Sequence, residues 1–344
     1  HGVWPVLTGT QFMNPRFSHQ FQLTTPIALA PMAQVSGGAL SAACARAGAL
    51  GLLGGGYGEL PWLQTQHALA LQLLQDDAPA LNRIGCGFIT WKLKEDASAL
   101  DWLLDQPHIP AALMLSFGDP RPYAARIAKR GVPLVCQIQQ LEQLPHCLEA
   151  GAAVIVAQGA EAGGHGTSGV QARATMSLVP EMADALAAHS PSTLLLAAGG
   201  IADGRGLAAA LMLGADGVLM GTRLWASAES LASSGAVAAA LQAHGDDTVR
   251  SSVFDVLRRK NWPPEYDFRA LRNRLHREWE SRVDELRAAP EAARADYEAG
   301  VAAQDFDRAH VTVGEAVGLL RDAPSAAVLI ERITKQAEAL MRSK

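Results

Sequence analysis

The sequence predicts an α/β fold, a (β/α)8 TIM barrel followed by an added C-terminal helical segment. From Ile27 onward, short apolar runs alternate regularly with stretches of helix length, and the runs themselves show no apolar–polar alternation. Continuous apolar strands are typical of a parallel sheet whose outer face is covered. Because parallel crossovers have one hand, eight such units favour closure into a barrel. The rival interpretation is an open, doubly wound sheet.

The strands and helices can be placed by these runs. The predicted strands are 27–32, 50–56, 83–90, 111–117, 133–138, 152–158, 193–199 and 217–223. The predicted helices between them include 41–47, 60–74, 121–130, 141–150, 176–189 and 204–214. We therefore assign 1–225 to the barrel with an N-terminal extension. The segment 226–344 is expected to be helical, to cover the barrel mouth and to return to complete the barrel, and it could also support a homodimer.

Composition indicates a soluble protein that acts on small molecules. Apolar residues make up 49% of the 344, charged residues 18%, and the net charge of −5 leaves no basic patch suited to nucleic acid. The four cysteines form no C-x-x-C pair and no zinc-like cluster, and no cationic, apolar leader is present, so we expect a cytoplasmic protein without a metal. The longest charge-free stretch, 17–45, is broken by prolines and glycines, which excludes a spanning helix.

A glycine loop around one histidine follows the sixth predicted strand. Gly163, Gly164 and Gly166 remove the Cβ atoms next to His165, so the backbone can approach a flat ligand while the imidazole faces it. Gly164, Gly166 and Gly169 also match a dinucleotide fingerprint, but the required helix and distant acid are missing. We interpret the segment as a catalytic loop, the alternative being a surface loop with an idle histidine.

Two further glycine loops follow the seventh and eighth strands, where barrels commonly bind phosphate. They contain Gly199-Gly200 and Gly221-Thr222, and should be neighbours in space. The bland alternative is that these glycines only make tight turns. Arg205 and Arg223 lie nearby and could contact phosphate or form surface ion pairs. A phosphate site facing an aromatic, glycine-lined opening indicates a phosphorylated planar cofactor, and FMN fits best.

Several motifs together resemble the nitronate monooxygenase family, formerly called 2-nitropropane dioxygenases. They are Ala30-Pro31-Met32, Glu161-Ala162-Gly163-Gly164-His165-x-Gly, Ala198-Gly199-Gly200-Ile201, Gly221-Thr222-Arg223 and, towards the C-terminus, Asn261-Trp262-Pro263, Arg269-Ala270-Leu271-Arg272-Asn273 and Gly314-Glu315-Ala316-Val317-Gly318-Leu319. The similarity runs from about Pro26 to the last helix. It implies an FMN-dependent oxidoreductase that oxidises alkyl nitronates with O2 to a carbonyl compound and nitrite.

The resemblance also implies roles for individual residues. His165 would be the catalytic base or hydrogen-bond partner of the substrate. Met32 would pack against the isoalloxazine ring, and Thr222 would add its hydroxyl to the backbone groups that hold the phosphate. The full set of implied cofactor-binding residues is Ala30, Pro31, Met32, Gln137, Gln158, Gly163, Gly164, Gly199, Gly200, Gly221 and Thr222.

The chain departs from the family pattern at three positions. Gly87 stands where well-known members have an asparagine near the flavin, and Gln137 and Gln158 stand where some have a lysine and an aspartate. A neutral amide in place of lysine would stabilise a reduced, anionic flavin less. The His165 loop also resembles flavin-dependent enoyl-acyl-carrier-protein reductases, and quinone reductases occur on related barrels. An NAD(P)H oxidoreductase of either type, or a non-catalytic flavin-binding protein, therefore remains the alternative.

Overall fold

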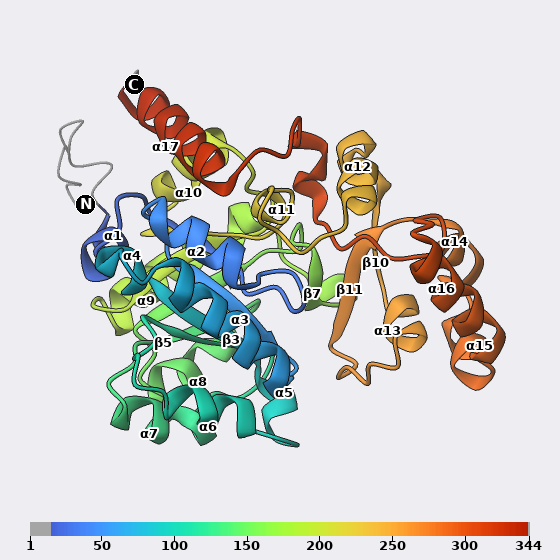
Figure 1. Ribbon diagram of the computed structural model, residues 1–344, viewed down its shortest axis with the longest axis horizontal. Helices are drawn as coiled ribbons and strands as arrows, with labels where there is room; N and C mark the ends of the chain where they lie inside the picture. The colour runs from blue at the N-terminus through green and yellow to red at the C-terminus, as the bar shows by residue number, and fades with distance from the viewer. Residues whose placement is uncertain (1–14, 343–344) are drawn as a thin grey trace.

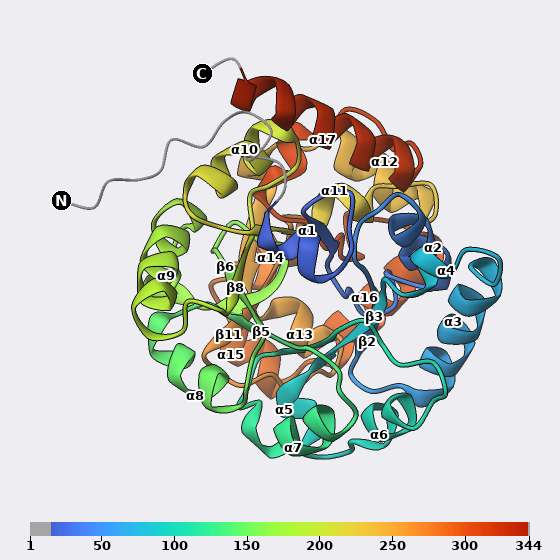
Figure 2. The same ribbon diagram turned by 90° about the vertical axis from the view of Figure 1, so that its left-hand side faces the viewer.

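A ring of eight parallel strands forms the centre of the computed structural model, which describes residues 15–342 (Figures 1 and 2). The strands are β1 (Ile27–Leu29), β2 (Gly51–Gly56), β3 (Ile84–Ile89), β4 (Leu113–Ser116), β5 (Leu134–Ile138), β6 (Val154–Gln158), β8 (Leu194–Ala198) and β9 (Gly217–Met220). They follow one another around the sheet, and β9 pairs with β1. The ring closes where the Leu29 N–H donates to the Leu50 carbonyl at 2.8 Å. The predicted barrel is therefore confirmed, with each strand inside its predicted range. The first part of the predicted N-terminal extension, 1–14, lies outside the described residues.

Helices surround the barrel on its outer face (Figure 2). They are α2 (Gly38–Arg46), α3 (Leu60–Leu73), α4 (Ala78–Leu81), α5 (Thr90–Leu93), α6 (Ser98–Leu104), α7 (Arg121–Lys129), α8 (Leu144–Glu149), α9 (Thr175–His189), α10 (Gly204–Met212) and α17 (Ala326–Arg342), and α1 (Arg16–Gln20) precedes the first strand. Apolar side chains fill both the barrel interior and the layer between strands and helices. Burial on both faces explains the strands' uninterrupted apolar sequence.

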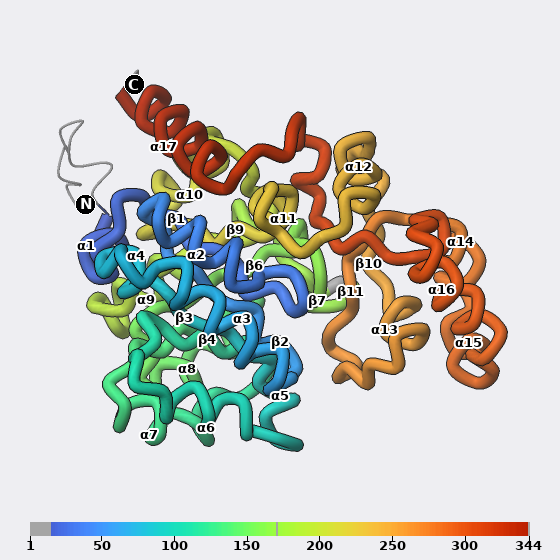
Figure 3. Tube along the Cα trace, viewed as in Figure 1, coloured from blue at the N-terminus to red at the C-terminus, as the bar shows by residue number. Residues whose placement is uncertain are grey.

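The last helix, α17, returns to the outer ring and packs against α10 and α2 (Figure 3). Its buried face carries Leu329, Ile330 and Ile333, spaced as one helical stripe. Gly204 at the start of α10 permits the close approach, because a Cβ there would lie 2.5 Å from the Ala337 nitrogen. None of the helices between residues 15 and 342 combines the length and apolar character needed to cross a membrane.

A second, smaller assembly lies beyond the carboxyl ends of the barrel strands (Figure 1). Its helices are α12 (Ser234–Gln242), α13 (Val253–Leu257), α14 (Arg274–Trp279), α15 (Val283–Ala288) and α16 (Glu291–Ala303), with short 3-10 turns at Gly245–Asp247 and Glu315–Leu319. The short helix α11 (Thr222–Trp225) connects β9 to it, and further 3-10 turns occur at Leu141–Gln143 and Gly169–Gln171. Phe254, Phe268 and Leu286 belong to its own apolar core. An apolar core separate from that of the barrel therefore stabilises this assembly.

This assembly also contains strands, which the sequence interpretation missed. β10 (Thr248–Ser251), β11 (Tyr266–Leu271) and β7 (Gly164–Thr167) form an antiparallel sheet. The predicted loop around His165 is thus partly a strand, with His165 opposite Phe268. The expectation that 226–344 is helical is therefore wrong in part, because β10 and β11 lie in this segment, alternate residues of β11 are buried, and α14 begins only at Arg274.

Candidate active site

One cavity of about 460 Å³ lies between the barrel mouth and the three-stranded sheet. Its size is within the usual range for a cofactor or substrate pocket. Every residue predicted for the site lines it: Ala30, Pro31, Met32, Gln137, Gln158, Gly163, Gly164, His165, Gly199, Gly200, Gly221 and Thr222. The structure therefore brings together residues from several strand ends. Their individual roles towards a ligand remain predictions.

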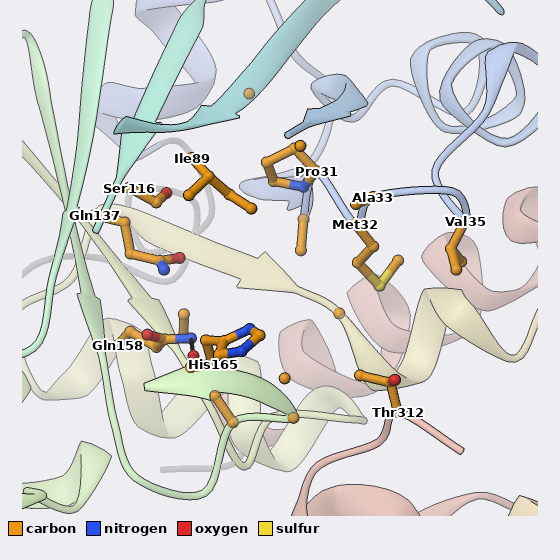
Figure 4. A pocket seen from close by; sticks show the side chains of 18 of the residues that line it. Pro31, Met32, Ala33, Val35, Ile89, Ser116, Gln137, Gln158, His165 and Thr312 are labelled. Carbon is orange, nitrogen blue, oxygen red and sulfur yellow. Dashed lines mark hydrogen bonds between the residues drawn. The ribbon is translucent and has the colours of Figure 1, made fainter. Parts of the chain in front are cut away.

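The wall formed by the first and third strands explains one departure in the sequence. A Cβ on Gly87 would lie 2.3 Å from the Pro31 Cγ, so Pro31 fills the space that a side chain at 87 would need. The turn that carries Pro31 is fixed by Ser36, whose hydroxyl donates to the Ala30 carbonyl at 2.8 Å. Met32 projects from the same turn towards the cavity (Figure 4). The cavity therefore has an apolar wall here, at the position where an asparagine at 87 would place an amide.

The opposite wall carries amides. The Gln158 Nε2 donates to the His165 carbonyl at 3.1 Å, and its Oε1 accepts from the Gln139 Nε2 at 2.8 Å. Gln137 is equally buried, makes no side-chain hydrogen bond with the described residues, and extends into the same space (Figure 4). Gln158 is therefore fixed by its neighbours, whereas the Gln137 amide has its donors and acceptor left for a ligand.

The glycine loops after β8 and β9 form an open cradle. A Cβ on Gly221 would meet nothing closer than 3.7 Å, and one on Gly200 nothing closer than 3.5 Å. The Thr222 Oγ1 accepts the Gly314 N–H at 2.9 Å, which leaves its own hydrogen for another acceptor. Bare backbone, a hydroxyl donor and open space suit a phosphate group. This end of the cavity therefore fits a phosphorylated cofactor.

The glycines beside His165 do not all have the same function. Gly164 has a φ of +72° and open space, since a Cβ there would meet nothing closer than 3.7 Å. Gly163 instead packs against backbone, because a Cβ at that position would lie 2.5 Å from the Gly314 nitrogen. The loop is held from behind by Arg250, which donates to the Ala162 carbonyl at 2.9 Å. Close packing thus explains Gly163, and open space for a ligand explains Gly164.

His165 is buried between a carboxylate and an indole. Its Nε2 is 2.9 Å from the Asp255 Oδ1, and its ring is stacked on Trp262 with centroids 3.4 Å apart and planes 10° apart. A carboxylate oxygen accepts, so the neutral imidazole carries its hydrogen on Nε2. Nδ1 then keeps its lone pair, and no hydrogen bond among the described residues engages it.

The surroundings of His165 keep the imidazole neutral. Burial lowers its pKa, and although the hydrogen bond and charge of Asp255 act in the opposite direction, the net shift is downward. Asp255 therefore fixes the tautomer and ring orientation without making the ring a permanent cation. A buried, oriented and neutral imidazole can accept a proton or a hydrogen bond at Nδ1.

The family model described as nitronate monooxygenase matches residues 94–336, which is well over half of the sequence. This chain belongs to the nitronate monooxygenase family. It is 36% identical over 342 residues to the nitronate monooxygenase npaC of Metarhizium robertsii, covering 91% of each chain. It is 30% identical to a nitronate monooxygenase of Neurospora crassa, covering 90% of this chain and 88% of that one. Members of the family are flavin-dependent oxidoreductases, and so is this chain.

Solved structures show the same fold. FabK from Thermotoga maritima has a TM-score of 0.78 at 24% identity and covers 96% of this chain and 98% of its own. A nitroalkane oxidase from Streptomyces ansochromogenes has a TM-score of 0.76 at 24% identity, with 95% and 99% covered. At this identity the likeness establishes the barrel and its added segment.

Several residues in or beside this family member's cavity were not predicted as site residues, among them Asp255, Arg258, Lys260 and Trp262. Trp262 lies in the Asn261-Trp262-Pro263 motif, and its Nε1 donates to the Tyr57 hydroxyl at 2.9 Å. That motif was the available signal, although it indicated no role. Asp255 is 90 residues from His165 in sequence, and nothing local marks it as a partner.

The two arginines near the phosphate loops form internal ion pairs instead. Arg205 is exposed and pairs with Asp203 at 2.7 Å, and Arg223 is buried and lies 3.5 Å from Asp322. Neither side chain lines the cavity. The alternative interpretation, a surface ion pair, fits Arg205, whereas Arg223 is buried where it meets Asp322.

Proposed function

We propose that this chain is an FMN-dependent nitronate monooxygenase that oxidises alkyl nitronates with O2 to a carbonyl compound and nitrite. The observation that carries the proposal is the buried His165–Asp255 pair, which faces the same cavity as the phosphate cradle. The two curated relatives named above carry that activity in their names. The substrate is a small molecule, in keeping with a cavity of about 460 Å³.

FMN, rather than FAD, is the flavin that the cavity favours. Gly199-Gly200 and Gly221-Thr222 would supply backbone groups for one phosphate, and the glycine pattern at Gly164, Gly166 and Gly169 lacks the helix and the acid that a dinucleotide site needs. Ala30, Pro31 and Met32 would form the apolar wall against the ring. When bound, the flavin supplies the electron-acceptor chemistry, and the protein positions the substrate against it.

The protein's own contribution centres on His165. For a neutral nitroalkane, Nδ1 would remove the proton next to the nitro group, with Asp255 stabilising the imidazolium that forms. A nitronate is already deprotonated and needs only a hydrogen bond and correct placement. Trp262, stacked on the imidazole, keeps water from one face of the base. Gln137 and Gln158 would add polar contacts. Gly164 would let the ligand approach the backbone, and Gly163 lets this loop pack against Gly314.

Anaerobic mixing of the yellow protein with an alkyl nitronate, and separately with NADH, tests the proposal. We expect the nitronate to change the flavin absorbance rapidly, and we expect NADH to leave the flavin absorbance unchanged on the same timescale. Rapid bleaching by NADH alone would instead assign an NAD(P)H oxidoreductase. Heat-released cofactor identified by chromatography should be FMN, and recovery of FAD would contradict the single phosphate site.

A further inference from the structure

Arg258 places an unused guanidinium at the His165 end of the cavity. It directly follows α13, the helix that carries Asp255, and lines the cavity. Its guanidinium carbon lies 4.7 Å from the centroid of the Phe268 ring, which is itself 4.9 Å from the ring of His165. Arg258 is thus held beside the proposed base by the Phe268 ring.

No carboxylate neutralises this arginine among the described residues. Its Nη1 is buried without a hydrogen-bond partner, and no ion pair includes it. Other arginines of the same assembly are paired: Arg250 with Asp267 and Arg259 with Glu298. Asp255 is one turn away, yet directs its Oδ1 to His165. Because Arg258 lines the cavity and no carboxylate pairs with it, an anionic occupant of the cavity is the available acceptor for its guanidinium.

We propose that Arg258 binds the two oxygens of the nitronate group and so orients the substrate carbon relative to His165. This inference rests on the proposed function and adds the residue that recognises the anion. A nitronate spreads its negative charge over two coplanar oxygens, which match the planar donor fork of a guanidinium as a carboxylate does. A neutral nitro group accepts the same hydrogen bonds more weakly. Arg258 therefore favours the anion over the neutral acid.

The other charged groups in the cavity do not replace it. Lys260 is held over the Tyr57 ring, with its Nζ 4.0 Å from the centroid, and presents a point charge rather than a fork. The lining carboxylates are Glu59 and Glu161, and Glu161 accepts from the Thr175 backbone N–H at 3.0 Å. Arg258 is accordingly the lining residue whose geometry can engage both oxygens together.

Three variants of the flavin-loaded protein test the inference. Arg258→Met keeps the apolar stem without the charge, Arg258→Lys keeps the charge without the fork, and Arg259→Met is the matched control at the exposed neighbour. We expect kcat/KM for the nitronate to fall about 10²-fold in Arg258→Met, the scale of one lost charge-assisted interaction. The loss should be partial in Arg258→Lys and absent in Arg259→Met. For a neutral nitroalkane the loss should be smaller.

Nitrate, a planar anion that does not react, provides a second measurement. It should inhibit nitronate oxidation competitively in the unaltered protein, and its inhibition constant should rise in Arg258→Met but not in Arg259→Met. Unchanged kcat/KM and nitrate inhibition in Arg258→Met would overturn the inference, as would loss of flavin from both Arg258 variants, which would assign the guanidinium to the cofactor. If Arg258→Met does not fold, full activity of Arg258→Lys would equally show that the guanidinium fork is not needed to bind the nitronate oxygens.

The test also separates this inference from the proposed function. Absence of any nitronate oxidation by the unaltered protein would refute the proposed function. Nitrate-induced changes in its flavin spectrum that require Arg258 would still support an anion site.

Discussion

At His165, burial and a carboxylate act on the same imidazole in opposite directions. Burial lowers the pKa and Asp255 raises it, and burial is the larger effect. The ring is consequently neutral near pH 7 while its orientation is fixed by a hydrogen bond of 2.9 Å. The stacked Trp262 adds a second constraint on ring position. A base of this kind is unprotonated near pH 7 and is held in a fixed orientation.

Replacing His165 by asparagine should separate turnover from cofactor binding. His165→Asn keeps polarity but removes the base, so activity should fall by roughly 10²-fold or more, the usual scale of general acid–base catalysis. The loss should be larger for a neutral nitroalkane than for its nitronate, which needs no deprotonation. Oxygen uptake with both substrate forms measures this. Unchanged kcat/KM for both would remove His165 from the mechanism.

Asp255→Asn should change the pH profile as well as the rate. With a neutral nitroalkane, activity requires neutral His165, so kcat/KM should rise with pH through the His165 pKa, which lies below the ordinary value of about 6.5. Asp255 raises that pKa, so its removal should move the acid limb to still lower pH. The amide also permits the wrong tautomer, and the plateau rate should fall by at least about 10-fold. An acid limb that does not move would show that Asp255 is not coupled to the base.

At the scale of elements, the site depends on where strands end and on what meets them there. Gly200 and Gly221 follow neighbouring strands and leave open space in the cavity. Gly163 instead packs closely against the backbone of the C-terminal segment at Gly314. The β7–β11 pairing then places His165 opposite Phe268. The barrel thus supplies the proposed phosphate end, and the antiparallel sheet holds the proposed base.

Valine at Gly200 or Gly221 should prevent flavin retention without unfolding the barrel. The side chain would occupy space where phosphate oxygens are expected to meet backbone N–H groups. Gly200 has a φ of +73°, so valine also strains the backbone there; Gly151→Val, at a φ of +76° with open space and far from the cavity, is the matched control. Flavin absorbance per protein measures retention. Stoichiometric flavin in both cavity variants would place the phosphate elsewhere.

At the scale of the whole molecule, the chain returns from the assembly above the barrel to finish the outer helix ring. The helix α17 covers α10 and α2, more than 100 residues after α10. Its apolar stripe is therefore part of the barrel core, although it lies at the C-terminal end of the described chain. The stability of the barrel therefore depends on α17, a helix that the chain reaches only after it has formed the assembly above the barrel.

Shortening a buried side chain of α17 should destabilise the barrel and leave the cavity unchanged. Ile333→Ala removes fully buried methyl groups and should lower the free energy of unfolding by about 2–5 kcal/mol. Val328→Ala, at an exposed position of the same helix, should change it by less than about 0.5 kcal/mol. Denaturant unfolding followed by circular dichroism measures both. Equal stability of the two variants would show that α17 is not an integral part of the barrel.

Local pattern alone was sufficient for the barrel and for one side of the site. The eight strands, most of the surrounding helices and the positions of the glycine loops follow from apolar runs and strand ends, which are short-range features. His165 and the glycines of these loops could be singled out in the same way, whereas the full set of eleven cofactor-binding residues came from the resemblance to the nitronate monooxygenase family. Their convergence on one cavity follows from the rule that parallel strands present their carboxyl ends at one face.

Tertiary structure decided what the local pattern could not. The segment around His165 is rich in glycine and has little strand preference of its own, so β7 forms only because β11, about 100 residues later, pairs with it. Asp255 and Trp262 contact the same imidazole, and Arg258 lies over the neighbouring Phe268 ring, through that pairing and through the packing of α13. Contacts between residues so far apart depend on the folded arrangement of the whole chain, and no periodicity or motif spacing records them.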